Sequence, residues 1–398
     1  MAHYKMLDGN CAAVEAIKMA KVKVVSAYPI TPQSTIAEKL SEICENGELE
    51  AKYIRVESEH SAMSCAIGAQ LTGVRTATAT ASVGLALMHE VVNVASGCRV
   101  PIVMPVVNRS LASPWSLWCD HQDSMAERDS GWLQLYCENV QDVYDTMIMA
   151  YRIAEDPRVL TPAMVCLDGF FLSHSMQKVM LPEQKEVDDF IGTYKVKNLH
   201  LDPSDPIVID NLTGSNECTE MKYQQAIGFK NAEDVMEEVF NEFSQKFGRT
   251  KAMIEGYNLE EAEALIVCIG SMAGTAKYVS DILRDQGKKV GVLKIVSFRP
   301  FPYKKLREII GNTKKLAVID RTTGFGGQGA PLWLEVKSAL KSDVLVKNYI
   351  AGLAGRDVNI ETIKNVYTDI LEGNDSDDPI WIDCGENVMN IREVLLND

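Results

Sequence analysis

The amino-acid sequence predicts an α/β protein in which two parallel-sheet units are joined by a linker. Short apolar runs of strand length alternate with helix-length segments from about residue 10 to residue 175. The same alternation resumes near residue 260. Several of these strands are apolar without interruption, as expected for a sheet that is buried on both faces. Buried strands separated by helices are typical of parallel α/β sheets.

The first unit is expected to alternate strands and helices in chain order. Apolar or β-branched runs predict strands at residues 22–26, 53–56, 76–81, 100–107 and 163–167. The spacing of apolar residues predicts helices at residues 32–45, 60–72 and 82–95. Ser82 is the expected N-cap of the third helix, because its hydroxyl can accept a hydrogen bond from a free N–H group of the first turn.

Residues 180–260 differ in composition, with clusters of Pro, Asp and Asn. One helix is expected there, over residues 232–247, with Asn231 as its N-cap and Gly248 as its stop. The second unit follows, with strands at 264–269, 290–296, 316–320 and 344–350 and helices at 274–284, 303–310 and 330–340. The predicted organisation is a first domain over residues 1–195, a linker with a helical insert over 196–259, and a second domain over 260–398.

The composition is that of an ordinary globular protein, with 46% hydrophobic and 24% charged residues. The net charge of −15 argues against nucleic acid or an anionic membrane as a partner. The ten cysteines show no C-x-x-C spacing, so neither a zinc site nor an iron–sulfur cluster is expected in this chain. The sequence has no membrane-length apolar stretch and no signal-peptide core, so a reducing, cytoplasmic location is expected.

Polar residues follow three of the predicted strands. Thr31 lies in the corner S-A-Y-P-I-T-P, where Pro29 and Pro32 remove backbone donors and stiffen the chain. Glu59 follows the strand at 53–56, and Asn108 and Arg109 directly follow the strand at 100–107. Ligands of parallel α/β sheets bind beyond the carboxyl ends of the strands. A hydroxyl, an acid and an arginine at that edge of one sheet predict a site for a small anionic substrate.

Each of these residues also has a plainer explanation. An acid such as Glu59 is favoured at the start of a helix by the helix dipole. Arg109 could form a surface salt bridge that contributes little. The segment D-H-Q-D, formed by Asp120, His121, Gln122 and Asp123, is predicted to lie in a pocket loop of the kind that carries function, with a solvated loop as the alternative.

Taken together, several motifs closely resemble one family over nearly the whole chain. They are A-Y-P-I-T-P, E-S-E-H-S-A, T-A-T-A-S-V-G-L-A-L-M-H-E, P-I-V-M-P-V-V-N-R-S-L, D-H-Q-D-S-M-A-E-R-D-S-G-W, I-G-S-M-A-G-T-A and S-F-R-P-F-P. The chain resembles the α subunit of multisubunit 2-oxoacid:ferredoxin oxidoreductases, and among them most closely the members that act on pyruvate. The resemblance implies a pyrimidine-type, thiamine-diphosphate-binding domain followed by a domain similar to the transketolase C-terminal domain.

The resemblance also implies a reaction and a set of partners. The family oxidatively decarboxylates a 2-oxoacid with coenzyme A, and it passes electrons through [4Fe-4S] clusters to ferredoxin. For pyruvate the products are acetyl-CoA and CO2. Thiamine diphosphate would be shared with a β subunit, which holds Mg²⁺ and the proximal cluster. The γ and δ subunits complete a heterotetramer whose further clusters lie outside this chain.

The family's residue roles fall on matching positions of this sequence. Glu59 matches the glutamate that hydrogen-bonds the aminopyrimidine ring and shifts it toward its imino tautomer. Thr31 matches the threonine beside the substrate, and Arg109 matches the arginine that pairs with the substrate carboxylate. Pro29, Ile30 and Ser82 are expected to contact the cofactor, and Asn108 and the D-H-Q-D loop are expected to lie nearby.

Two segments depart from the family's usual pattern. Residues 80–84 read T-A-S-V-G where the resemblance predicts T-S-S-Q-G, and residues 111–115 read L-A-S-P-W instead of a sequence containing S-A-P-I. Both lie near the expected pocket, so a branched-chain 2-oxoacid, 2-oxoglutarate or oxalate remains an alternative substrate. A transketolase-like or dehydrogenase component without ferredoxin, and a non-catalytic assembly subunit with a borrowed fold, are the alternative functions.

Overall fold

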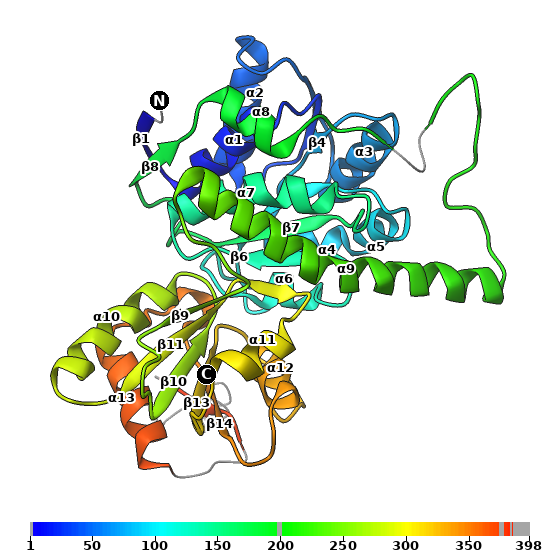
Figure 1. Cartoon of the computed structure of the whole chain (residues 1–398). Helices are drawn as coiled ribbons and strands as arrows, with labels where there is room; N and C mark the ends of the chain where they lie inside the picture. The colour runs from blue at the N-terminus through cyan, green and yellow to red at the C-terminus, as the bar shows by residue number, and fades with distance from the viewer. Residues whose placement is uncertain (1–2, 197–200, 374–377, 383, 385–398) are drawn as a thin grey trace, which may run out of the picture.

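The computed structural model describes residues 3–196, 201–373, 378–382 and 384. Figure 1 shows two α/β halves, one above the other, with the second half running from yellow-green to red. The predicted α/β class with two sheet-containing units is confirmed. The boundaries of the domains stay a prediction, and parts of the predicted linker and second domain lie outside the described residues.

The first half of the chain contains strands β1–β8 and helices α1–α9. The strands are β1 (His3–Leu7), β2 (Val24–Ala27), β3 (Lys52–Arg55), β4 (Thr76–Ala77), β5 (Val103–Asn108), β6 (Leu133–Tyr136), β7 (Ala163–Asp168) and β8 (Gln177–Leu181). The helices are α1 (Gly9–Met19), α2 (Ser34–Glu45), α3 (Glu59–Leu71), α4 (Ser82–Leu87), α5 (His89–Gly97), α6 (Gln122–Ala126), α7 (Val140–Ala154), α8 (Gln184–Ile191) and α9 (Ser215–Phe247).

The second half has a parallel sheet with one antiparallel edge strand, in the order β15-β14-β13-β10-β11-β9. Its strands are β9 (Ile254–Tyr257), β10 (Ala264–Cys268), β11 (Val290–Ile295), β13 (Lys315–Asp320), β14 (Leu345–Ile350) and β15 (Ile380–Trp381). Its helices are α10 (Met272–Asp285), α11 (Tyr303–Ile309), α12 (Pro331–Ala339), the 3-10 turn η1 (Leu353–Gly355) and α13 (Ile360–Glu372). Strand β12 (Ser297–Arg299) leaves this sheet and pairs with β6 of the first half.

The strands of the first half that lead to the candidate site belong to two hydrogen-bonded sheets, not to the predicted single sheet. One has the order β3-β2-β4, and the other has the order β12-β6-β7-β5. A single parallel bridge between Thr80 and Val106 joins them. The strand predicted at 76–81 is therefore cut short. The physical reason is Pro105 in β5, which has no N–H group for the next bond of a parallel ladder.

The helix predicted at 82–95 is divided into α4 and α5. Its predicted N-cap is wrong, because the capping position is occupied by Ala81 and no side chain makes the capping bond. Ser82 instead has a left-handed φ of 49°, and its Oγ donates a 2.5 Å hydrogen bond to the carbonyl of Ser110. The hydroxyl is thus directed toward the segment after β5.

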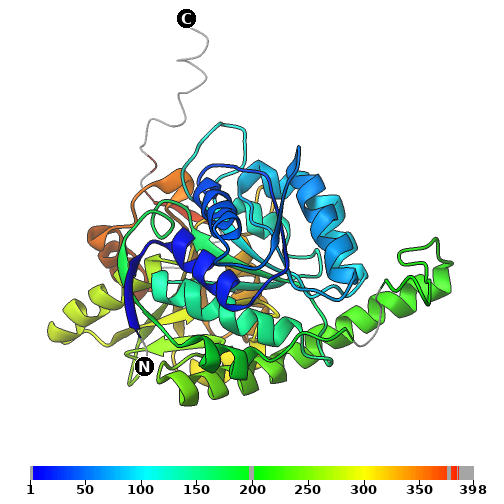
Figure 2. The same ribbon diagram turned by 90° about the horizontal axis from the view of Figure 1, so that it is seen from above.

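The helix predicted at 232–247 is the second half of a much longer helix. Helix α9 has 33 residues and begins after Gly214, so Asn231 lies within the helix and is not its N-cap. The predicted stop is confirmed, because Gly248 has a left-handed φ of 69°. Figures 1 and 2 both show the first turns of α9 extending beyond the rest of the first half. Among the described residues, no helix combines the length and apolarity needed to cross a membrane.

A buried group of charges joins the two halves. Lys294 of β11 is buried, and its Nζ lies 3.0 Å from Glu138 Oε2 and 2.8 Å from both Asp142 Oδ2 and Glu255 Oε2. Burial alone would raise the pKa of Asp142, but Lys294 and Lys251 hold it well below its usual range. The pair of Asp142 with Lys294 therefore connects α7 of the first half to the sheet of the second.

Replacement of Lys294 by methionine is expected to lower the free energy of unfolding by about 3–5 kcal/mol, because it leaves buried carboxylates without their central cation. Urea unfolding followed by circular dichroism measures this. The pKa of Asp142 is depressed, so its contribution is present above the pKa of the unfolded chain and is lost as the pH falls through the folded value. The decrease in the free energy of unfolding caused by Lys294→Met should therefore be smaller in strong acid than at pH 7.

The matched control is Lys305→Met, because Lys305 lies 3.6 Å from Glu237 at a half-exposed position. Such a pair contributes about 0–1 kcal/mol. Equal stability of Lys294→Met, Lys305→Met and the wild type at pH 7 would contradict the role assigned to the buried charges.

Candidate active site

The predicted site residues lie where strands β2, β3 and β5 end. Thr31 follows β2, Glu59 is the first residue of α3 after β3, and Arg109 follows β5. Helix α4, which follows β4, brings Gly84 to Glu59. Despite the break between the two sheets, the structure thus brings segments from four successive strand ends together, as the rule for ligand sites in α/β folds predicts.

Glu59 is a buried acid with an unusually close neighbour. Glu59 is 6% exposed, and the side chain of Ser58 caps helix α3, which begins at Glu59. A Cβ atom on Gly84 would lie 2.6 Å from Glu59 Oε1 and 2.7 Å from Thr80 Oγ1. A side chain at position 84 would therefore force Glu59 or Thr80 to move, because Cβ contacts this short are essentially never seen. Gly84 and Thr80 thus surround the carboxyl group of Glu59, and these three residues form a small cradle.

The cradle fits the aminopyrimidine end of thiamine diphosphate. Thr80 Oγ1 is buried and has no hydrogen-bond partner within the part of the chain that the structure describes. Buried polar atoms are normally paired, so an unpaired hydroxyl beside a buried acid is suited to a polar ligand. The carboxyl of Glu59 and the hydroxyl of Thr80 supply hydrogen-bonding groups of the kind that a nitrogen heterocycle with an exocyclic amine requires.

The guanidinium of Arg109 is held in a fixed position. Its Nε donates to the carbonyl of Ser116 and its Nη1 donates to the carbonyl of Thr31, each at 2.9 Å. The ring of Trp115 lies 5.7 Å from the guanidinium carbon. Burial lowers the pKa of Arg109 from its usual value, while Asp123 opposes this. Arg109 thereby connects the segment after β5 to the proline-bounded corner.

The corner formed by Pro29, Ile30 and Thr31 is held mainly through hydrogen bonds of its backbone groups. Thr31 is exposed, and its carbonyl accepts the bond from Arg109. Ile30 is half-buried, and its N–H donates to Gln33 Oε1 at 3.2 Å. Pro29 is exposed and lines a surface hollow beside α2 with Tyr28. The structure thus brings Thr31 to Arg109, whereas Pro29 faces the hollow along α2.

The residues of the D-H-Q-D segment are largely buried, so the solvated-loop alternative is wrong. Asp120 is 2% exposed and accepts hydrogen bonds from the N–H groups of Gln122 and Ala354. Burial raises the pKa of Asp120 to about 6. His121 is completely buried, and Gln122, the first residue of α6, is half-buried. Asp120 and His121 therefore contact other parts of the protein rather than solvent.

His121 belongs to a buried network that reaches the second half of the chain. Its Nε2 lies 2.8 Å from Asp168 Oδ1, and Asp168 Oδ2 accepts hydrogen bonds from Arg321 Nη1 at 2.8 Å and from Ser271. Burial alone would raise the pKa of Asp168, but Arg321 and His121 hold it well below its usual range. Cys119, His121 and Asp168 are close enough together to ligate a metal, but the charge that pairs with Asp168 is that of Arg321.

Asn108 and Asp123 lie together on the side of the site nearer to α4. Asn108 Nδ2 donates to Asp123 Oδ1 at 2.8 Å, and Asp123 Oδ2 accepts bonds from the N–H groups of Ser82 and Arg109. Burial raises the pKa of Asp123, while these donors oppose the shift. Ser82, expected to contact the cofactor, is fully buried and contacts Asp123 and Ser110.

Four residues of this region were not singled out from the sequence. Thr80 and Gly84 lie in the motif T-A-T-A-S-V-G, but the closeness of Gly84 to Thr80 and to Glu59 depends on how α4 packs on α3. Asp168 and Arg321 are 153 positions apart, so no local pattern could pair them. The sequence offers one hint of their importance: each is an ionisable residue at the end of a buried strand. Asp168 ends β7, and Arg321 directly follows β13.

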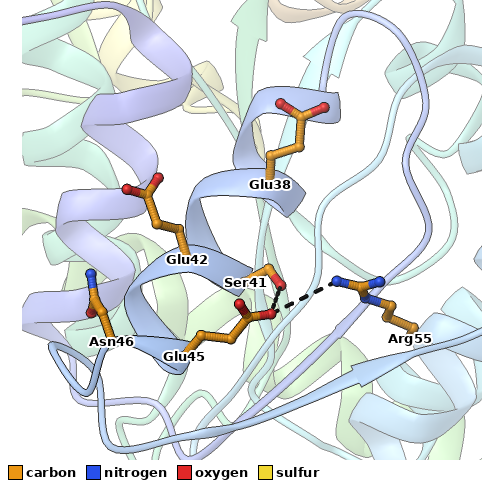
Figure 3. A pocket seen from close by; sticks show the side chains of 6 residues that line it. All are labelled: Glu38, Ser41, Glu42, Glu45, Asn46 and Arg55. Carbon is orange, nitrogen blue, oxygen red and sulfur yellow. Dashed lines mark hydrogen bonds and ion pairs between the residues drawn. The ribbon is translucent and has the colours of Figure 1, made fainter.

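A surface hollow of about 500 Å³ lies elsewhere, along α2. Figure 3 shows its lining, in which Glu45 accepts a bond from Ser41 and faces Arg55 at 3.8 Å. Its other lining residues are Glu38, Glu42 and Asn46. This hollow shares Glu38, Ser41 and Arg55 with the hollow that Pro29 lines, but it is a different one, and none of the predicted site residues lines it.

Comparisons with known proteins show the family to which the chain belongs. The thiamine-diphosphate-binding family model of pyruvate flavodoxin/ferredoxin oxidoreductase matches residues 15–241. The model of the pyruvate:ferredoxin oxidoreductase core domain II matches residues 262–363. Pyruvate synthase subunit PorA of Methanocaldococcus jannaschii is 47% identical over 97% of this chain and 99% of its own. Ketoisovalerate oxidoreductase subunit VorA of Pyrococcus abyssi is 44% identical over 92% of this chain and 93% of its own.

Solved structures support the same fold. A 2-oxoglutarate:ferredoxin oxidoreductase from Magnetococcus marinus superposes with a TM-score of 0.73 at 19% identity, over 92% of this chain and 65% of that one. A split-gene transketolase superposes with a TM-score of 0.54 at 13% identity, over 92% of this chain and 99% of that one. At such identities these matches show the fold alone. The family models and the relatives together confirm the predicted resemblance: the chain belongs to the pyruvate flavodoxin/ferredoxin oxidoreductase family.

Proposed function

We propose that this chain is the α subunit of a 2-oxoacid:ferredoxin oxidoreductase that acts on pyruvate. The reaction converts pyruvate and coenzyme A to acetyl-CoA and CO2, and passes two electrons to ferredoxin. The observation that carries the proposal is the buried carboxyl of Glu59 against Gly84 and Thr80, in a chain of a thiamine-diphosphate-binding family. The identity of 47% to a pyruvate synthase subunit supports pyruvate as the acid.

Glu59 would hold the aminopyrimidine ring of thiamine diphosphate by a hydrogen bond. When bound, the cofactor supplies the carbanion chemistry that decarboxylation of a 2-oxoacid requires. Gly84 would help to orient Glu59, because its lack of a side chain lets α4 pack directly against the carboxyl. The unpaired hydroxyl of Thr80 would make a second polar contact at this end of the site. The side chains of this chain thereby set the position and the protonation of the ring.

Arg109 would pair with the carboxylate of the substrate. Its Nε and Nη1 groups are used by the carbonyls of Ser116 and Thr31, which leaves the Nη2 side of the planar guanidinium for the substrate. Thr31 lies at this end of the site, where its hydroxyl can reach the reacting group. The prolines beside Thr31 hold it still, because an error of about 1 Å at a reacting centre can cost 10²-fold in rate.

The active site would be completed by other subunits. A β subunit would hold the diphosphate, Mg²⁺ and the proximal [4Fe-4S] cluster, and the γ and δ subunits would complete the electron path to ferredoxin. The scattered cysteines support this division, since their spacing does not suit a cluster. All ten lie in the described residues, and none of them forms a disulfide. A cytoplasmic location stays part of the proposal.

A branched-chain 2-oxoacid is the second candidate substrate. The ketoisovalerate relative, at 44% identity, is as similar to this chain as the pyruvate synthase subunit of Pyrococcus abyssi. The altered segment at Ala81 and Val83, which precedes Gly84, and the segment that contains Trp115 border the site. Overall identity therefore favours pyruvate by a small margin only, 47% against 44% for the ketoisovalerate relative.

A substrate panel tests the proposal. The complex is purified anaerobically through a tag on this chain, and reduction of a viologen dye is followed with pyruvate, 2-oxoisovalerate, 2-oxoglutarate and oxalate, each with and without coenzyme A. We expect the highest kcat/KM with pyruvate and a requirement for coenzyme A. A preference for 2-oxoisovalerate would support the second candidate. No reduction with any acid, from a complex that contains clusters and thiamine diphosphate, would contradict the function.

A further inference from the structure

Asp123 makes four hydrogen bonds that connect three chain segments around the site. Its Oδ1 accepts from Asn108 Nδ2 at 2.8 Å and from the N–H of Ser124 at 2.7 Å. Its Oδ2 accepts from the N–H of Ser82 at 2.9 Å and from the N–H of Arg109 at 3.0 Å. The residue is 1% exposed. A buried carboxyl surrounded by four N–H donors is matched to the ionised, acceptor-only form.

The two bonds to Oδ2 join the cofactor side of the site to the substrate side. Ser82 begins α4, which carries Gly84 into contact with Glu59. Arg109 carries the guanidinium that holds the Thr31 corner. The bond from Ser82 Oγ to the carbonyl of Ser110 ties the same two segments a second time. One carboxylate oxygen of Asp123 therefore fixes the distance between the start of α4 and the backbone of Arg109.

A shift of the start of α4 would change its contact with Glu59. A Cβ on Gly84 would be 2.6 Å from Glu59 Oε1, so α4 packs against the carboxyl at a position that the missing side chain of Gly84 makes possible. Ser82 also has a left-handed φ of 49°, a conformation that a non-glycine residue keeps only when its surroundings impose it. The bonds to Asp123 and Ser110 supply that constraint.

We propose that Asp123 is a positioning residue that aligns Glu59 and Arg109 with each other through the backbone N–H groups of Ser82 and Arg109. The inference rests on the proposed function of the site and adds a residue that acts on both of its ends. Asp123 is 1% exposed, so it would act not by touching substrate or cofactor but by fixing the segments that do.

The substitution Asp123→Asn tests the proposal, because it keeps the shape of the side chain and replaces one acceptor oxygen with an N–H donor group. In either orientation that group faces N–H donors, either those of Ser82 and Arg109 or those of Asn108 and Ser124. We expect kcat/KM for the 2-oxoacid to fall about 10²-fold, with a raised KM, because a displacement near 1 Å at the reacting centre costs that much. We also expect less thiamine diphosphate per complex after dialysis, since the contact of Gly84 with Glu59 loosens.

The matched control is Asp129→Asn, the same chemical change at a nearby, 78% exposed side chain. This variant should keep the wild-type KM and cofactor content. A purely structural role of Asp123 would lower the yield of assembled complex without changing the KM or the cofactor content of the complex that does assemble. Wild-type values of both quantities in assembled Asp123→Asn complex would overturn the proposal.

A second variant decides the question if Asp123→Asn does not assemble. Asn108→Ala removes one donor to Asp123 and keeps its three bonds from backbone N–H groups, so it should change the same two quantities in the same direction but by a few-fold only. Wild-type values in the Asn108→Ala complex would then overturn the proposal. Retention of thiamine diphosphate is measured without substrate, so it tests the role of Asp123 even if the wild-type complex oxidises none of the acids tried. In that case the proposed function alone would fail.

Discussion

Replacement of Glu59 by glutamine is expected to lower kcat about 10²–10⁴-fold, the range for loss of an acid–base group. Glutamine has nearly the same shape, so it fits against Gly84 and Thr80, but its amide cannot share a proton with the aminopyrimidine ring. The KM for the 2-oxoacid should change little, because Arg109 is untouched. Anaerobic dye reduction with pyruvate and coenzyme A, normalised to cluster content, measures both parameters.

Glu57→Gln is the matched control for this variant. Glu57 lies two residues earlier, is exposed, and accepts a 2.6 Å hydrogen bond from Ser61 Oγ at the surface. It should keep wild-type kcat. If the Glu59→Gln complex assembles and also keeps wild-type kcat, the chain is a non-catalytic assembly subunit, as the alternative function supposes.

Replacement of Arg109 by lysine is expected to act mainly on substrate binding. A lysine ammonium cannot bond the carbonyls of Ser116 and Thr31 and also present a planar pair of donors to a carboxylate. Loss of a hydrogen bond to a charged group costs about 1.5–3 kcal/mol, or roughly 10- to 100-fold in affinity. We therefore expect the KM for the 2-oxoacid to rise by this factor, with a smaller fall in kcat.

The control for this second variant is Arg152→Lys, since Arg152 is a half-exposed residue 3.7 Å from Glu242. That change should leave the steady-state parameters unaltered. An unchanged KM for every 2-oxoacid in the Arg109→Lys complex would contradict the assignment of Arg109 to the substrate carboxylate, whatever the effect on kcat.

Much of the site could be predicted from local sequence because it lies at strand ends. Apolar runs located β2, β3 and β5 to within a few residues, and the polar residues after them were therefore expected at one edge. That reasoning needs only the strand positions and the rule for parallel sheets. It placed Glu59 and Arg109 without any knowledge of how the sheet is hydrogen-bonded, and the break at Pro105 did not affect it.

The elements that could not be predicted are those whose environment is set by distant parts of the chain. Helix α7 is buried on almost all sides, so its acids lie in the interior and need partners from elsewhere in the chain. Its acids Asp142 and Asp145 pair with Lys294, Lys251 and Arg249 from the second half of the chain. The first turns of α9 are mostly exposed and lack an apolar stripe, so the predicted helix began too late.

The same limit applies to the contacts within the site. The identity of Gly84 matters because of its distance to Glu59, and the role of Asp123 follows from N–H groups of Ser82 and Arg109 that a sequence pattern does not display. A motif can show that such residues occur together. It cannot show which backbone group each side chain meets.

The measurement that tests the central claim most directly is the product stoichiometry of the wild-type complex, purified through this chain and supplied with pyruvate, coenzyme A and oxidised ferredoxin under anaerobic conditions. Oxidative decarboxylation predicts one acetyl-CoA, one CO2 and two singly reduced ferredoxin equivalents for each pyruvate consumed, and no turnover without coenzyme A. Release of CO2 without reduction of ferredoxin, or turnover independent of coenzyme A, would contradict the account and favour a thiamine enzyme of the transketolase or dehydrogenase type.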